Sequence, residues 1–138
     1  MSRHDYTFSS LITRLLQIEH GISELYSSQC LPESAFSSYL QEYKDMSTRL
    51  ERARTESVTE FTLEPIPSSG IDEIILNIES VVHDDSLSLT QKLIRSEKLN
   101  AELLKHASAL VAAISAEANQ LLRGAYRKAE RRSELLAR

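Results

Sequence analysis

Apolar residues recur every three or four positions along most of the chain, which is the spacing that lines one face of a helix. The first such run covers about residues 6–30, the second about 33–57, and a short third about 71–82. From about residue 89 to 137 the same spacing continues without a proline. The pattern predicts an all-α protein whose last stretch is either one long helix or two. If a turn divides it, we expect the turn at Lys105–Ser108, where the apolar face thins.

Prolines and glycines mark the connections between these predicted helices. Pro32 fits the first turn of the second helix, and the short connection before it makes the first two helices antiparallel neighbours. Pro65, Pro67 and Gly70 mark one long connection. With only three glycines and three prolines, the chain lacks the frequent turn residues that most β folds need. Gly21, inside the first helix, indicates either a close helix contact or a tolerated weakness.

The length and the composition bound the class of protein. The 138 residues fit a single domain over residues 1–138. A lone cysteine, Cys30, excludes an intrachain disulfide and a cysteine-based zinc site, and it suits the cytoplasm. No apolar run approaches the ~20 residues of a membrane helix, so we expect no membrane span.

Charge is unevenly distributed along the chain. The net charge is −4, whereas residues 123–138 hold six cations against two glutamates. This basic, amphipathic end is a candidate docking helix for an acidic partner, or else a solvated helix end where the helix dipole favours cations. The excess of four charges is small beside the ~6–10 phosphate contacts of a DNA-binding protein, which argues against nucleic acid as the partner.

The string Leu15–Tyr26 (LLQIEHGISELY), followed by Phe36-x-x-Tyr39-Leu40 and Ser88-Leu89-x-x-x-Leu93-x-x-x-Glu97, resembles the ferritin-like superfamily, nearest to its rubrerythrin-like branch. The resemblance implies a four-helix up-down bundle, with the short helix added in the connection between helices 2 and 3. It also implies two metal ions, held by a glutamate from each of two helices and a Glu-x-x-His pair from each of the other two.

The resemblance carries over only part of that ligand set. Glu19 matches the glutamate of the first helix and Glu97 that of the third. The Glu-x-x-His positions hold Lys44 and Ser47 in the second helix, and Glu117 and Gln120 in the fourth. Three carboxylates therefore remain as candidate metal ligands: Glu19, Glu97 and Glu117. The set lacks both histidines that help select iron or manganese, and Lys44 would put a cation near the metal position.

Other chemistry is sparse in this sequence. Glu79 with His83, and Glu102 with His106, have the i,i+4 spacing that can hold a divalent metal such as zinc, although such pairs arise often by chance in glutamate-rich helices. A catalytic zinc needs three convergent protein ligands, and neither pair supplies a third. No nucleophile motif and no glycine-rich phosphate loop is present, so we expect neither catalytic nor cofactor-binding residues.

The sequence favours a non-enzymatic helical bundle without cofactor, which acts through protein contacts or self-association, most simply as a homodimer. One alternative is a di-metal carboxylate protein, a metal-binding or oxidoreductase protein that holds iron or manganese. A second alternative is a coiled-coil adaptor in which Leu89 to the C-terminus forms one helix.

Overall fold

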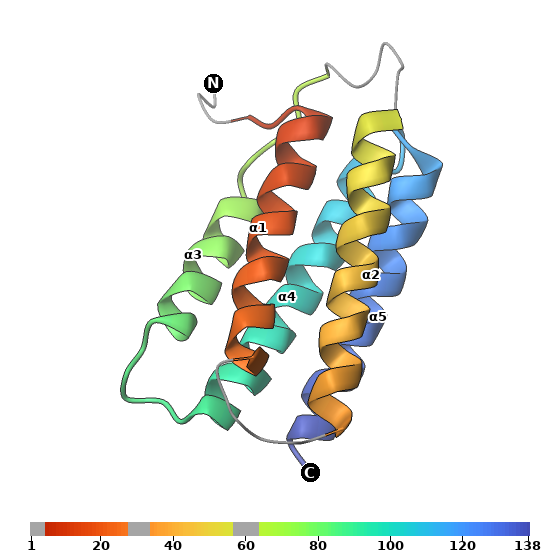
Figure 1. Cartoon of the computed structure of the whole chain (residues 1–138). Coiled ribbons are helices and arrows are strands. Elements are labelled where there is room, and N and C mark those ends of the chain that lie inside the picture. Colours follow the sequence, from red (N-terminus) through yellow and green to blue (C-terminus); the bar gives the residue numbers. More distant parts are fainter. Residues whose placement is uncertain (1–4, 28–33, 57–63) are drawn as a thin grey trace.

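The computed structural model describes residues 5–27, 34–56 and 64–138, and it is all-helical apart from one isolated bridge in those ranges. Figure 1 shows the five helices of these ranges. They are α1 (Phe8–Ser27), α2 (Ser34–Glu56), α3 (Ile71–Val82), α4 (Leu89–Val111) and α5 (Ala116–Leu136). The all-α class and the short helix at 71–82 are confirmed. Cys30 and the predicted connection at Pro32 lie outside the described residues.

The four long helices form a ring of neighbours. α1 packs against α2 and α4, and α5 packs against the same two helices. Successive helices run in opposite directions, and α3 lies outside the ring against α1 and α4 (Figure 1). The apolar stripes meet in one core, whose largest fully buried side chains are Phe8, Leu11, Ile12, Leu15, Ile22, Tyr26, Leu50, Ile71, Ile75, Ile78, Leu93 and Leu103.

The turn between α4 and α5 lies at Ala112–Ser115, so the expectation of a turn at Lys105–Ser108 is wrong. The backbone N–H groups of Ile114 and Ser115 both donate to the carbonyl oxygen of Val111, at 2.9 Å. Ser115 then caps α5 by accepting a hydrogen bond from the N–H of Ala118 at 3.1 Å. Ala112 keeps helical backbone angles and Ser115 is extended, so the turn needs neither glycine nor proline.

This turn contradicts the coiled-coil adaptor with one helix from Leu89 onward. α5 folds back along α4 instead of continuing it, and the two pack together over most of their length (Figure 1). The apolar stripes of the two helices are therefore buried in contacts within a single chain.

The described part of the connection before α3, residues 64–70, is held at two places. Tyr6 and Ile66 exchange two backbone hydrogen bonds, at 2.8 and 2.7 Å, which join this connection to the segment before α1. Gly70 then takes φ +83° at the start of α3, a backbone conformation that favours glycine. The His106 ring lies 3.0 Å from where a Cβ of that residue would be, so α3 starts in close contact with α4.

Gly21 makes no close helix contact, so that interpretation is wrong. A Cβ built at Gly21 meets no atom within 4 Å, and the residue lines an open groove between α1 and α3. We expect Gly21→Ala to raise the free energy of unfolding by about 1 kcal/mol, because alanine has the higher helix propensity. Gly124→Ala in α5, where a Cβ is equally free, should give a similar gain. Urea denaturation measures both, and a loss of stability at Gly21 would contradict the open groove.

Candidate functional site

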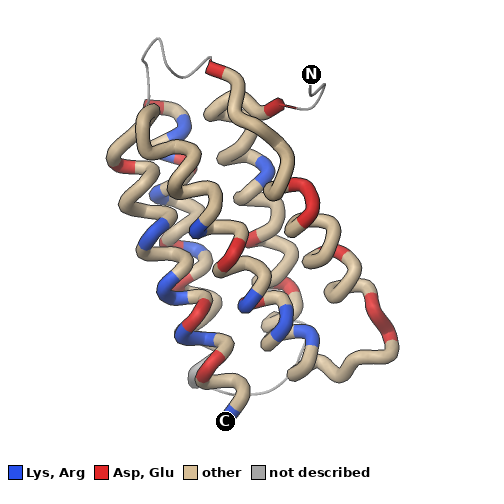
Figure 2. Tube along the Cα trace, turned by 180° about the vertical axis from the view of Figure 1, so that it is seen from behind, with Lys and Arg blue, Asp and Glu red and all other residues tan. Residues whose placement is uncertain are grey.

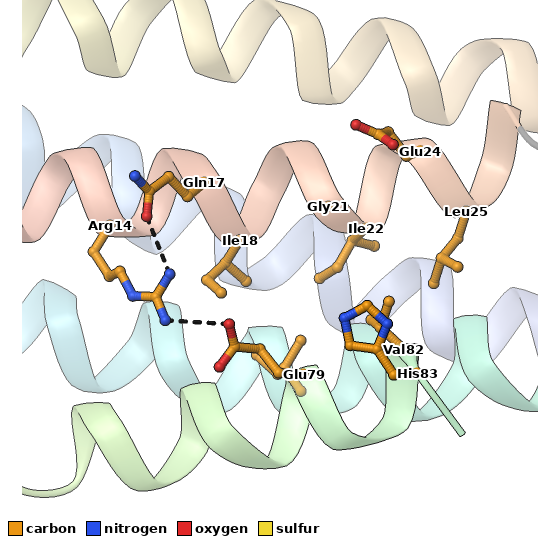
Figure 3. Close-up of a pocket in the computed structure, with 11 residues that line it drawn as sticks. Arg14, Gln17, Ile18, Gly21, Ile22, Glu24, Leu25, Glu79, Val82 and His83 are labelled. Carbon is orange, nitrogen blue, oxygen red and sulfur yellow. Dashed lines mark hydrogen bonds and ion pairs between the residues drawn. The ribbon is translucent and has the colours of Figure 1, made fainter. Parts of the chain in front are cut away.

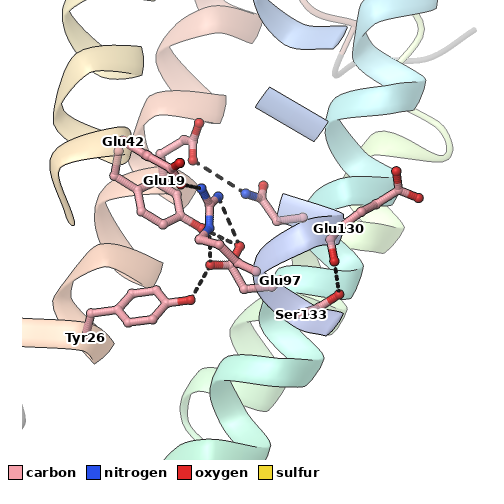
Figure 4. Close-up of polar contacts among 9 residues, drawn as sticks. Glu19, Tyr26, Glu42, Glu97, Glu130 and Ser133 are labelled. Atoms are coloured by element: carbon pink, nitrogen blue, oxygen red, sulfur yellow. Dashed lines mark hydrogen bonds and ion pairs between the residues drawn. The ribbon is translucent and has the colours of Figure 1, made fainter. Parts of the chain in front are cut away.

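A buried ion cluster lies at the centre of the ring, around the carboxylate of Glu97 in α4 (Figure 4). The Oε2 atom of Glu97 accepts hydrogen bonds from the Tyr26 hydroxyl at 2.5 Å and from Arg132 Nε at 2.7 Å. Its Oε1 atom accepts from the Tyr43 hydroxyl at 2.5 Å and from Arg132 Nη2 at 3.3 Å. α1, α2 and α5 thus each supply a donor to one carboxylate that is 0% exposed.

Arg132 is the cation of this cluster, and its side chain is only 4% exposed. Its Nη1 atom donates to Glu42 Oε1 of α2 at 2.8 Å, and its guanidinium carbon lies 4.2 Å from the centre of the Tyr43 ring. Burial by itself would lower the pKa of Arg132, but the interactions with Tyr43 and Glu97 outweigh it, so the pKa is raised above its ordinary value. The guanidinium is therefore a permanent internal cation.

Two tyrosines complete the shell around Glu97. Burial, and after it the charge of Glu97, raises the pKa of both Tyr26 and Tyr43 above the ordinary value. Both phenols therefore stay protonated at neutral pH and remain hydrogen-bond donors. The ring of Tyr26 is also held by edge-on packing against Phe36 at 5.2 Å and Tyr39 at 5.7 Å between centroids.

Glu19 of α1 lies beside this cluster and is less well satisfied. It is 2% exposed, and the amide Nδ2 of Asn100 reaches its Oε2 atom only at 3.5 Å. Burial raises the pKa of Glu19 to about 7; Arg132 opposes that shift and Glu97 adds to it. Nearby on α4, the Ser96 hydroxyl and the Asn100 carbonyl oxygen are the buried side-chain atoms of the described chain without a hydrogen-bond partner.

The structure brings two of the three predicted metal ligands together. Glu19 and Glu97 share the cluster, which Glu42 joins from α2. Glu117 is exposed near the start of α5, where Asn119 Nδ2 donates to the Ser108 carbonyl of α4 at 2.7 Å. Ser108 and Glu97 are eleven positions apart on one helix, or roughly 16 Å along its axis. Over the described ranges, no group of three His, Cys, Asp or Glu side chains is placed to hold a metal ion.

The helix positions that the resemblance assigned to the Glu-x-x-His pairs do not face this cluster. Lys44, Glu117 and Gln120 are exposed, and Ser47 lies half-buried at the edge between α1 and α2. The expectation that Lys44 puts a cation near the metal position is therefore wrong. Arg132 is the cation there, because antiparallel packing sets the second half of α5 beside the first half of α2.

One member of each predicted histidine pair makes another contact. Glu79 accepts a hydrogen bond from Arg14 at 3.3 Å, while His83 is exposed at the end of the groove. His106 packs over Gly70, away from the buried ion cluster. Neither pair meets a third ligand among the described residues.

No family model matches the chain, and no curated protein or solved structure is significantly similar to it. Within the ranges that the structure describes, no helix is both long and apolar enough to cross a membrane.

Sequence reasoning missed the roles of Arg132, Tyr26, Tyr43 and Glu42. A signal for Arg132 exists, since it falls on the apolar stripe of α5 that runs through Ala125, Ala129 and Leu136. A single charge on an apolar stripe indicates a buried partner, because burying an unpaired charge is costly. The tyrosines carry no such signal, because a tyrosine on an apolar stripe is common in any core.

The space around the buried ion cluster is very small. A cavity of about 10 Å³ lies among Glu19, Glu42, Tyr43 and Arg132, which is about the room that one water molecule needs. A groove of about 370 Å³ lies outside the ring, between α1 and α3 (Figure 3). Ligand sites are commonly ~300–1,000 Å³, so room for another molecule is found at the surface and not beside the buried carboxylates.

Proposed function

We propose that the protein is a non-enzymatic four-helix bundle of the ferritin-like kind, in which Arg132 takes the place of metal ions, and that it acts through contacts of its surface with other protein molecules. The observation that carries this proposal is the saturation of Glu97. Both of its oxygens accept hydrogen bonds from protein donors, two from phenols and two from Arg132.

The residues do not fit a metal centre as they stand. A metal ion needs free carboxylate lone pairs, whereas those of Glu97 are directed at four N–H and O–H donors. A divalent ion beside Arg132 would also meet a buried positive charge with a raised pKa. Arg132 neutralises Glu97, while Glu19, with a pKa of about 7, can stay protonated, so the interior is balanced without a metal.

The helix arrangement supports the proposed kinship. α1 and α4, which supply Glu19 and Glu97, lie next to each other, and α2 and α5 complete the ring. α3 fits the extra helix expected in the connection between the second and third long helices.

Metal binding provides the test of this proposal. We expect the purified full-length chain, incubated anaerobically with Fe(II) or with Mn(II) and then desalted, to retain far less than one ion per chain. Elemental analysis measures the retained metal, and thermal unfolding should show no rise in Tm with either ion, because no pre-formed site releases binding energy.

Retention of two tight ions per chain would overturn the proposal in favour of the di-metal alternative. Glu19→Ala and Glu97→Ala would then lower the metal content, whereas Glu117→Ala, at an exposed site far from the cluster, would leave it unchanged.

A further inference from the structure

Two large hydrophobic side chains are exposed in the described part of the chain, and they lie on different helices. Leu76 of α3 is 65% exposed and Leu135 of α5 is 38% exposed. α3 packs on α1 and α4, whereas α5 packs on α2 and α4. The two leucines therefore belong to helices at opposite edges of the molecule (Figure 1).

The surroundings of Leu76 are acidic. Residues 64–88 carry six acidic residues and no lysine or arginine. Helical spacing places Asp72, Glu73 and Glu79 next to Leu76, at positions i−4, i−3 and i+3. We call Leu76 with these three carboxylates the acidic face. Arg14 of α1 is the one cation among the groove-lining residues beside it, and it already contacts Glu79 and Gln17 (Figure 3).

The groove between α1 and α3 adds apolar surface next to the acidic face. Its lining includes Ile18, Ile22, Ile78 and Val82, and Gly21 leaves its middle open.

The surroundings of Leu135 are basic. Lys128, Arg131 and Arg138 lie at positions i−7, i−4 and i+3, and all three are exposed. We call Leu135 with these three cations the basic face. Glu130 and Glu134 line a hollow with Lys98 and Lys105 of α4. Glu134 borders the basic face, because helical spacing places it next to Arg131 and Arg138. Figure 2 shows acidic positions along α3 and the turn after it, and basic positions interspersed with acidic ones along the C-terminal half of α5.

We propose that the acidic face and the α1–α3 groove of one molecule bind the basic face of a second copy of this chain. Each face offers one exposed leucine surrounded by charges, and the charges of the two faces are opposite in sign. Because the faces lie at opposite edges, the contact is head-to-tail: a bound pair still has one free face of each kind. The association should therefore continue beyond a dimer, into chains or rings.

This inference rests on the proposed function, since it names the partner of the surface contacts proposed there. Its first test is sedimentation velocity of the full-length wild type over a range of protein concentrations. At about 0.01 M salt we expect species larger than a dimer to grow with concentration, and at about 1 M salt we expect monomer, because the screening length falls from ~30 to ~3 Å. A monomer at every concentration in low salt would overturn the inference.

A second test uses two leucine variants and their mixture. Leu76→Gln disables the acidic face and Leu135→Gln disables the basic face, so each alone should associate at least about tenfold more weakly than wild type. Mixed in equal amounts, they should form a 1:1 complex that grows no further, since the pair has one intact face of each kind. A contact between two identical faces predicts no such recovery, and that outcome would overturn the head-to-tail arrangement.

Arg52→Gln is the matched control, at an exposed site on α2 outside both faces, and it should associate like wild type. Circular dichroism checks that the helices of each variant are intact, which we expect because both leucines are exposed. These measurements can contradict the self-association without contradicting the proposed function. A protein that binds no metal but stays monomeric at low salt would overturn only the self-association.

Discussion

Replacing Arg132 by methionine is expected to lower the free energy of unfolding by about 3–5 kcal/mol. The substitution keeps much of the side-chain volume but leaves Glu97, which is 0% exposed, as a buried carboxylate without its cation. It also removes the bond to Glu42 and the stacking on Tyr43. Urea denaturation followed by circular dichroism measures the loss.

Two further variants separate the charge effect from a loss of packing. Arg131→Met changes the neighbouring, exposed arginine and should stay within about 0.5 kcal/mol of wild type. The double variant Arg132→Met with Glu97→Gln should recover most of the loss, because no charge is then left buried at the centre, and a glutamine can still accept from a tyrosine hydroxyl. If the double variant were as unstable as Arg132→Met alone, the loss would come from packing and not from the unpaired charge.

Replacing Glu19 by glutamine is expected to abolish a loss of about 3 kcal/mol in the free energy of unfolding that the wild type undergoes as the pH rises. Burial raises the pKa of Glu19 to about 7 in the folded chain, against an ordinary value of 4.5. Below about pH 4.5 the acid is protonated in both states. Between there and about pH 7 only the unfolded state loses the proton, so the stability of the wild type falls as the pH rises.

The measurement is the free energy of unfolding of wild type and Glu19→Gln in urea, from about pH 4 to 8. The glutamine imitates the protonated acid, so the two proteins should be similar at the acidic end, and the variant should be the more stable above pH 7. Arg132, Glu97 and Glu42 face the same interior, and they remain in both proteins, so the difference isolates Glu19. Glu102→Gln, at an exposed site on α4, should follow the wild type. Parallel curves for wild type and Glu19→Gln would contradict the raised pKa.

The bounds of a helix could be predicted where the local pattern of apolar and turn-forming residues determines them. α3 matches its predicted span because five apolar residues in helical spacing follow the Pro- and Gly-containing connection directly. The turn before α5 could not be placed, because it uses Ala112 in a helical conformation and Ser115 as a cap, and both residue types are also common within helices. A turn without a positive φ leaves no glycine signal in the sequence.

The candidate site was predictable in part. Glu19 and Glu97 were carried over from the resemblance to the ferritin-like superfamily, and Glu19 also lies one position past the inward-facing Ile18. Glu117 was carried over from the same resemblance, at the position of the Glu-x-x-His pair in the fourth helix. Once the turn is at 112–115, Glu117 lies at the far end of the ring from Glu97, and Arg132 reaches the carboxylate instead.

By itself, the amino-acid sequence determined that this protein is all-α and that its negative and positive charges are separated along the chain. These properties follow from spacing and composition, which act within one helix. Only the tertiary structure decided which groups meet. Tyr26, Tyr43 and Arg132 lie 71, 54 and 35 positions from Glu97, and their contact depends on the directions and registers of four helices. The packing of whole helices sets those registers, and it brings a cation to the carboxylate where the sequence had suggested a metal ion.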